Sequence, residues 1–166
     1  MQTGTESVEA TEERPHLRML TEGPIATGYK VSYLSSFYSG PIYKVIEPRY
    51  GLARPKLNVL LCLSQLGVLT ATQIIEACGQ PRASISRAAI SLIKERRIVA
   101  RTSPDDARRQ LLQITRSGEK ILKTVMPLFI QRHRDMLAVL SSREQDELER
   151  ILRKLALRND GWTRPY

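Results

Sequence analysis

Residues 69–116 read LTATQIIEACGQPRASISRAAISLIKERRIVARTSPDDARRQLLQITR, and they decide the fold that the sequence predicts. Thr70 and Gln73 form a capping-box pattern that begins a short helix, and Gly79 ends it. A tight turn with Pro81 leads into a second helix. Its apolar residues recur at helical spacing, at Ile85, Ala88, Ala89, Leu92 and Ile93. Two short helices joined by a glycine-containing turn predict a helix-turn-helix.

The second half of the same stretch predicts a β-hairpin. The run 97–101 is β-prone, and apolar and polar residues alternate over 112–114, as expected for strands. Between these runs, Ser103-Pro104-Asp105-Asp106 is a strong turn signal. A hairpin directly after a helix-turn-helix is a wing. We therefore expect a winged helix-turn-helix domain over residues 52–116.

Helical patterns also precede this stretch. We expect a helix over about 31–46, which Gly40-Pro41 kinks or interrupts and which ends at Pro48. A mostly buried helix should then run from Arg54 to the residue before Gly67. Residues 1–22 are polar and acidic, and we expect a flexible tail there.

Two further helices follow the hairpin. Thr115 should cap a long helix that continues to about Val139, with a bend at Pro127. Ser141 and Glu144 form a second capping box before the last helix. The predicted fold class is therefore mainly α with a small β-hairpin wing.

The terminal helices carry apolar stripes that a winged domain alone would not cover. The clearest lies on the last helix, at Leu148, Ile151, Leu152 and Leu155. Such stripes in a small protein commonly pair with a second copy, so we expect a homodimer. Residues 23–51 would be the N-terminal dimerisation helix and residues 117–160 the C-terminal dimerisation helices. The alternative is that these helices fold back on their own domain.

The positive charge is concentrated in the predicted winged domain. The chain has 166 residues and a net charge of +9, a surplus that attracts polyanions. Residues 52–116 contain eleven Lys and Arg against four Asp and Glu, whereas the rest of the chain has fifteen against thirteen. This distribution is consistent with a nucleic-acid partner, and a generic basic surface is an equal alternative. Double-stranded DNA is the partner that the predicted helix-turn-helix favours.

The second helix of the helix-turn-helix has a polar face opposite its apolar one. An α-helix fills the major groove, and short side chains let the backbone approach the bases closely. Serine hydroxyls can bind a phosphate or a base edge, and an arginine can contact guanine or a phosphate through two hydrogen bonds. A solvated polar face is the alternative. The residues of this face are Arg82, Ser84, Ser86 and Arg87.

Several classes of function lack their sequence signals. Cys62 and Cys78 do not have zinc-ligand spacing, and His133 is expected to be a packed or surface residue. Neither a phosphate-binding glycine loop nor a GxSxG motif occurs. We therefore expect no catalysis, metal or cofactor, and leave open a redox role for the cysteines. Without a secretory or membrane-spanning pattern, the expected location is the cytoplasm and not the membrane.

In their order and spacing, these pieces resemble the MarR family of bacterial transcriptional regulators. The resemblance extends from Leu57 to Leu155. The matching pieces are Val59-Leu60-Leu61-Cys62-Leu63, Leu69-Thr70-Ala71-Thr72-Gln73-Ile74, Ala83-Ser84-Ile85-Ser86-Arg87, Pro104-Asp105-Asp106-Ala107-Arg108, Leu112-Gln113-Ile114-Thr115 with Gly118, and Leu140-Ser141 leading to Glu144.

The resemblance implies a dimeric, sequence-specific regulator, typically a repressor, that binds a pseudo-palindromic operator. The DNA-binding residues would be Arg82, Ala83, Ser84, Ser86, Arg87, Asp106, Arg108 and Arg109, with Arg108 entering the minor groove. Further contacts to phosphates, or a general positive electrostatic field, would come from Arg54, Lys56, Lys94, Arg96, Arg97 and Arg101. A small aromatic or phenolic acid would act as effector. The candidate contacts are Tyr33, Phe37, Tyr38 and Tyr43, and packing in the dimer core is the alternative for each of them.

Two departures from the family pattern concern the second helix. Arg97 stands where the family usually has glycine, so we expect this helix to end differently. Ile90 and Ser91 replace a charged pair, which leaves the base preference open. The other function class that the sequence allows is a winged-helix module that binds protein without specific DNA binding.

Overall fold

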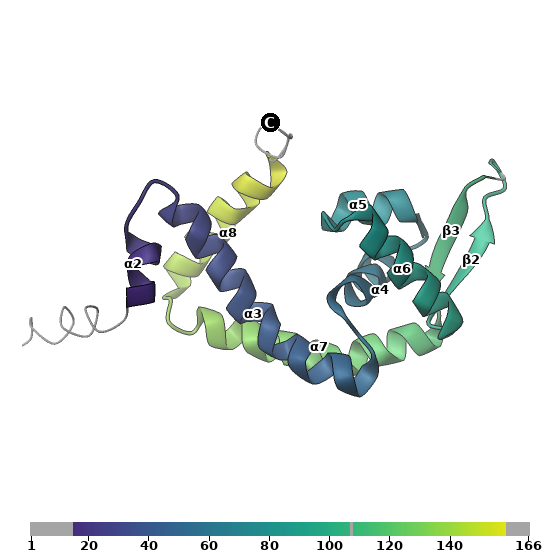
Figure 1. Ribbon diagram of the computed structural model, residues 1–166, viewed down its shortest axis with the longest axis horizontal. Coiled ribbons are helices and arrows are strands. Elements are labelled where there is room, and N and C mark those ends of the chain that lie inside the picture. Colours follow the sequence, from purple (N-terminus) through teal and green to yellow (C-terminus); the bar gives the residue numbers. More distant parts are fainter. Residues whose placement is uncertain (1–14, 107, 159–166) are drawn as a thin grey trace, which may run out of the picture. The chain divides into compact units, whose positions relative to one another are not determined.

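The computed structural model describes residues 15–106 and 108–158. The chain divides into two compact units, with the boundary between Val125 and Met126. The first unit contains, in chain order, α2 (Pro15–Thr21), α3 (Ala26–Tyr50), α4 (Arg54–Leu66), β1 (Leu69–Thr70), α5 (Ala71–Cys78), α6 (Arg82–Lys94), β2 (Ile98–Thr102), β3 (Gln110–Ile114) and the first part of α7 (Arg116–Leu137) (Figure 1). The second unit contains the rest of α7 and α8 (Ser142–Leu157).

The predicted fold class, mainly α with a winged helix-turn-helix, is confirmed. Helices α5 and α6 form the helix-turn-helix, and β2 and β3 form an antiparallel hairpin in which Ile98 pairs with Ile114 and Thr102 with Gln110. The structure adds a strand that the sequence pattern did not reveal. Strand β1 pairs antiparallel with β3, which makes a three-stranded sheet of order β1-β3-β2.

The core of the first unit lies where α4, α5 and α6 pack against one another, with β3 against α4 and α5 and β2 against α6. Helices α4 and α6 each contribute an apolar face with buried residues at helical spacing, and α5 contributes Ile74. Fully or nearly fully buried side chains come from α4, α5, α6, β2 and β3: Leu57, Leu60, Leu63, Ile74, Ile85, Leu92, Ile98 and Leu112. This core holds α6 with its opposite face toward solvent.

Helix α3 is longer than the sequence predicted. It begins five residues before the expected start, continues through Pro41, and passes Pro48 to end at Tyr50. The expected stop at Pro48 is therefore wrong. Each proline removes one backbone hydrogen bond and crowds the carbonyl four residues before it. Ile42 and Ile46 lie between the two prolines and are buried, and this packing holds the helix together. The end is set by Gly51, which adopts φ 64° and donates its N–H to the Glu47 carbonyl.

The chain ends differ in part from the expectation. A short helix, α2, occupies the last part of the stretch that we expected to be a flexible tail over residues 1–22. Residues 1–14 and 159–160 of the expected segments lie outside the described residues. Helix α7 contains Pro127 without a break, and Ser141 and Glu144 form the predicted capping box of α8.

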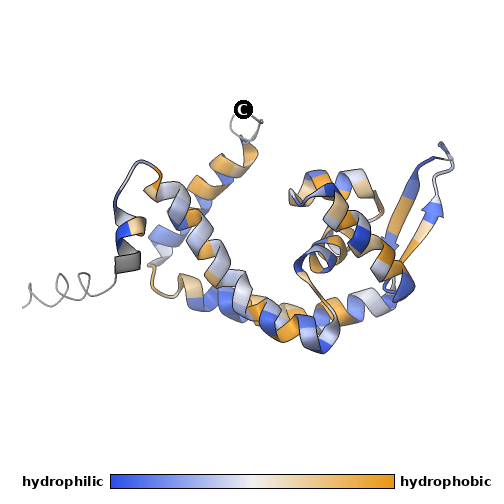
Figure 2. Cartoon of the chain, viewed as in Figure 1, coloured by the Kyte–Doolittle hydropathy of each residue, from blue (hydrophilic) through white to orange (hydrophobic). Residues whose placement is uncertain are grey.

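Helices α3 and α8 each expose apolar side chains. None of the residues of α8 is buried, and Ile151, Leu152 and Leu155 are 42%, 45% and 49% exposed. Figure 2 shows the apolar and polar residues that alternate along α8. On α3, Val31, Leu34 and Phe37 are exposed. Among the described helices, none combines the length and the apolar character needed to span a membrane.

Candidate nucleic-acid interface

The turn between α5 and α6 is built from local capping interactions. Thr70 caps α5: its hydroxyl accepts the Gln73 N–H, and the Gln73 side chain accepts the Thr70 N–H. At the other end, Gly79 adopts φ 64° and donates its N–H to the Ile75 carbonyl at 2.8 Å. The Pro81 carbonyl then accepts the N–H groups of Ser84 and Ile85, which starts α6. The predicted caps of α5 are thus confirmed.

The outer face of α6 presents most of the predicted DNA-binding residues to solvent. Arg82, Ala83, Ser86 and Arg87 are exposed, whereas Ser84 is half-buried. The same face includes Ile90, a large apolar residue that is 56% exposed. The face therefore combines two cations, small side chains that permit close backbone approach, and one apolar contact.

Ser84 lies in a shallow cavity of about 310 Å³ between α4 and α6. The cavity is lined by Ala53, Pro55, Lys56, Ser84, Arg87, Ala88 and Ser91. Arg87 thus borders both this cavity and the exposed face of α6.

The C-terminal end of α6 differs from the expectation about Arg97. The left-handed residue is Arg96, with φ 57°, and not Arg97. The Arg96 N–H is donated to the Ile93 carbonyl and the Arg97 N–H to the Leu92 carbonyl, both at 2.9 Å. This pair of bonds is a Schellman motif, which normally has glycine at the left-handed position. The position of this helix end that favours glycine is therefore Arg96 and not Arg97.

The wing tip is organised by Asp106. One of its carboxylate oxygens accepts the Arg108 N–H at 2.9 Å, and the other lies 3.3 Å from Nε of Arg109. The Asp106 carbonyl accepts the Arg109 N–H. Arg109 is thereby held at the tip, while the exposed side chain of Arg108 has no such carboxylate contact among the described residues.

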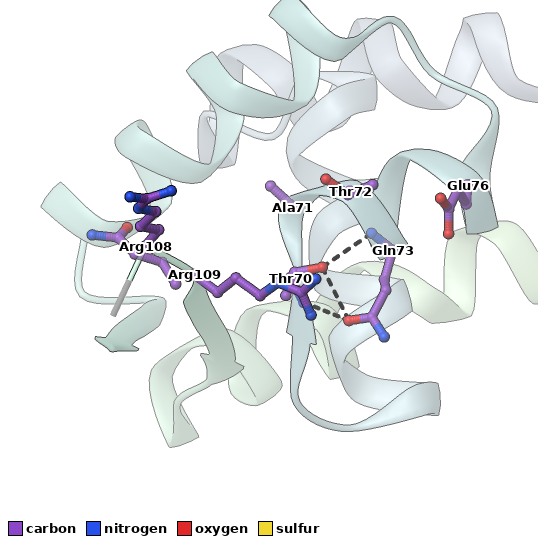
Figure 3. A pocket seen from close by; sticks show the side chains of 8 residues that line it. Thr70, Ala71, Thr72, Gln73, Glu76, Arg108 and Arg109 are labelled. Atoms are coloured by element: carbon purple, nitrogen blue, oxygen red, sulfur yellow. Dashed lines mark hydrogen bonds between the residues drawn. The ribbon is translucent and has the colours of Figure 1, made fainter. Parts of the chain in front are cut away.

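A cavity of about 590 Å³ separates the wing from the start of α5. Its α5 side is formed by Thr70, Ala71, Thr72, Gln73 and Glu76, and its wing side by Arg108, Arg109 and Gln110. Figure 3 shows the Arg109 side chain extending toward Thr70, with Glu76 farther along α5. Sequence analysis did not predict that the N-terminal turn of α5 would share a site with the wing. The unpredicted β1–β3 pairing brings the two segments together.

Three of the additional cations have partners inside the fold. Arg54 donates to the Ser39 hydroxyl at 2.6 Å, and its guanidinium lies 5.2 Å from the Tyr43 ring centre. Lys56 and Arg97 both form ion pairs with Glu95. Lys56 and Arg97 are structural cations in this chain, whereas Arg54 is bonded to Ser39 but is itself exposed. Lys94, Arg96 and Arg101 are exposed and can add to the positive field.

The four candidate effector residues are divided along α3. The rings of Tyr33 and Phe37 contact each other at 4.5 Å, and Phe37 is 60% exposed. Tyr43 is half-buried beside Arg54. Burial raises the pKa of Tyr43, and the positive charge of Arg54 offsets part of that shift. Tyr38 is also half-buried, and neither cavity described above is lined by any of the four.

The two cysteines are free and half-buried in α4 and α5. Burial raises the pKa of the Cys62 thiol, and the neighbouring Cys78 raises it further. A raised pKa favours the protonated thiol, which is the less reactive form. Among the described residues, no group of three or more His, Cys, Asp or Glu side chains is placed to hold a metal ion.

Comparison with known proteins connects this arrangement to transcriptional regulators. No protein-family model matches the sequence. The chain is 37% identical over 84 residues to the transcriptional repressor MprA of Escherichia coli strain K12. This match covers 51% of the chain and 48% of MprA, so the chain spans about half the length of that curated relative.

Solved structures of MarR-family regulators share the fold. A MarR-family transcriptional regulator from Silicibacter pomeroyi superposes with a TM-score of 0.73 at 21% identity, over 82% of this chain and 91% of the other. BpsR from Bordetella bronchiseptica superposes with a TM-score of 0.69 at 19% identity, over 78% and 91% of the two chains. Its structure concerns the regulation of DNA binding by 6-hydroxynicotinic acid.

Proposed function

This chain has the fold of the MarR family of transcriptional regulators, and we propose that it is a sequence-specific DNA-binding regulator, most simply a repressor. One observation carries the proposal. The polar face of α6, with Arg82, Ser86 and Arg87, is exposed directly before a wing whose tip exposes Arg108. Because duplex DNA is the proposed partner, we expect the protein to act in the cytoplasm.

Each part of this surface suits a different part of the duplex. Helix α6 would enter the major groove, where Arg87 can contact guanine or a phosphate and the small residues allow close approach. The wing would place Arg108 in the minor groove, whose negative potential is highest where it is narrow. Asp106 would keep the tip ordered, and Arg109 with the α5 N-terminal turn would face the backbone between the two grooves.

The exposed apolar residues of α3 and α8 support a homodimer. Apolar stripes of this kind are removed from water when a second copy covers them. A two-fold dimer presents two recognition helices, so its operator should be a near palindrome with half-sites about one DNA turn apart. Coverage by a different protein is the alternative.

A small aromatic acid is the effector class that we propose. The support is the aromatic content of α3 together with the regulation of BpsR by 6-hydroxynicotinic acid. Tyr33 and Phe37 could stack on an aromatic ring, and exposed Lys44 is a cation on the same helix, about two turns after Phe37. The ligand would alter the separation of the two recognition helices and so weaken DNA binding.

The test is binding to duplexes selected from a random pool. Arg87→Ala and Arg108→Ala should each weaken specific binding by roughly 1–3 kcal/mol, with the fold and the dimer unchanged. Binding should also fall steeply as salt rises. Arg150→Ala is the matched control, because it removes one exposed arginine from α8 and should leave affinity unchanged.

Unchanged gel shifts for both arginine variants would reject this site assignment. Failure of the wild-type protein to bind random duplex or heparin at low salt would favour the protein-interaction module instead.

A further inference from the structure

Three charged side chains meet at the C-terminal end of α6, and we call them the charge clamp: Lys56, Glu95 and Arg97. Lys56 Nζ lies 2.5 Å from Oε1 of Glu95, and Arg97 Nε lies 3.2 Å from Oε2. The Ser91 hydroxyl also donates to Oε1 of Glu95, at 2.9 Å. The side chains of Lys56 and Arg97 are only 18% and 19% exposed, so the clamp is largely shielded from water.

The clamp connects the adjoining ends of α3 and α4 with the end of α6, across 39 and 47 positions of the sequence. Arg97 donates through Nη2 to the carbonyl of Tyr50, the last residue of α3, at 2.9 Å. Lys56 is in the first turn of α4, and Ser91 is in the last turn of α6. The end of α3, the start of α4 and the end of the recognition helix are therefore held by one set of contacts.

The backbone beneath the clamp is tightly constrained. The Arg97 carbonyl accepts the Thr115 N–H at 3.0 Å and the Thr115 hydroxyl at the same distance. A Cβ on Gly118 would overlap that same carbonyl oxygen, so the start of α7 packs directly on it. Arg97 thus extends its side chain from a backbone position with little freedom to adjust.

Stabilisation of the fold does not explain why these three charged side chains are brought together. The desolvation of partly buried ions offsets much of their attraction, so well-packed apolar residues would serve stability as well. Directional hydrogen bonds between charged groups do fix geometry. Burial by itself would raise the pKa of Glu95, but hydrogen bonds from Lys56 and Ser91 and the charge of Arg97 outweigh it and lower the pKa. Glu95 is therefore ionised near neutral pH. Its Oε1 accepts hydrogen bonds from Lys56 and Ser91, whereas its Oε2 is paired with Arg97 by charge and, among the described residues, has no hydrogen-bond donor.

We propose that Lys56, Glu95 and Arg97 are positioning residues that lock the recognition helix to the end of α3. The inference rests on the proposed function, in which α3 belongs to the dimer and α6 reads the operator. If α6 is fixed to α3, the two helices move together. The arrangement of the two α3 helices in the dimer then sets the distance between the two recognition helices. The clamp would thereby determine which half-site spacing the protein accepts.

The experiment measures discrimination between operators and not affinity alone. A selected operator is compared with versions in which one base pair is added to or removed from the spacer between half-sites. Wild-type protein should prefer the selected spacing. Glu95→Gln keeps the side-chain shape but removes the charge. In this variant, the affinity for the selected operator divided by the affinity for an altered operator, which we call the spacing ratio, should fall by at least about fivefold.

Lys56→Met is a second variant that leaves the Glu95–Arg97 pair and the end of α6 intact. It should fold and should also reduce the spacing ratio. Glu147→Gln is the matched control, since it breaks the exposed Glu147–Arg150 pair on α8 by the same chemical change. Its spacing ratio should equal that of the wild type.

A merely stabilising role predicts a different result. Both clamp variants would then unfold at lower temperature and bind all spacers more weakly, with an unchanged ratio. That result would overturn the inference while the proposed function stands. If wild-type protein binds no specific duplex, both are rejected.

Discussion

At the scale of single residues, Gly118 is a position where close packing leaves room only for glycine. Its conformation is not left-handed, so an L-residue would meet no backbone strain there. The obstacle is space, because an added Cβ would overlap the Arg97 carbonyl oxygen and would lie 2.8 Å from a side-chain carbon of Ile114. Neither the carbonyl nor the paired strand can move without disturbing the hairpin.

We predict that Gly118→Ala lowers the free energy of unfolding by roughly 1–3 kcal/mol, as is typical of overpacking. The measurement is urea denaturation followed by circular dichroism. Gly28→Ala is the control, because Gly28 is within α3 and a methyl group added there would have nothing within 4 Å. That change should be neutral or stabilising, since alanine favours helix. Equal loss in both variants would contradict the packing explanation.

At the scale of elements, the C-terminal end of α6 carries an unusual cap. Arg96 occupies the left-handed position of the Schellman motif that closes α6. An L-residue there is strained, because its Cβ approaches the following carbonyl oxygen. The motif persists because the Leu92 and Ile93 carbonyls are satisfied and the charge clamp holds the next residue.

Arg96→Gly should therefore stabilise the protein by about 1 kcal/mol relative to Arg96→Ala. Both variants lose the same charge, so the difference isolates the backbone strain. Thermal denaturation of the two variants under identical salt is the measurement. If alanine is as stable as glycine here, Arg96 does not adopt the left-handed conformation in solution.

At the scale of the whole molecule, the exposed apolar residues bear on the association of the chain with a second copy. The first unit buries its own core, whereas α8 exposes Ile151, Leu152 and Leu155 on one stripe. An isolated amphipathic helix of this length is marginal in water, because packing supplies most of its stability. The proposed dimer accounts for the stripe.

Leu155→Glu should weaken the proposed dimer, because it places a charge within the stripe that a second copy would cover. If the wild type dimerises through this stripe, sedimentation velocity over a concentration series should show the variant as monomer at concentrations where the wild type is dimeric. Ser142→Glu, at the exposed N-terminal end of α8, adds the same single charge and should leave the association unchanged. An unaltered dimer in Leu155→Glu would remove α8 from the interface.

The sequence by itself predicted where several helices begin and end. Thr70 with Gln73 and Ser141 with Glu144 predicted two helix starts, and Gly79 predicted a helix end, because caps join residues three or four apart. Helical spacing predicted the buried face of α6 and hence its exposed polar face. These signals were sufficient for the winged helix-turn-helix and for the placement of Arg82, Ser86 and Arg87 on its surface.

Contacts between residues far apart in the sequence are determined by the tertiary structure and could not be predicted from local patterns. Lys56 meets Glu95 across 39 positions, and Arg97 meets the Tyr50 carbonyl across 47, so no local pattern marks them as structural cations. Strand β1 has two residues, too few for an alternation, and exists because β3 pairs with it. Helix α3 passes two prolines because burial of Ile42 and Ile46 outweighs the lost hydrogen bonds. In each case the partner comes from a remote part of the chain, and its contribution arises only from packing.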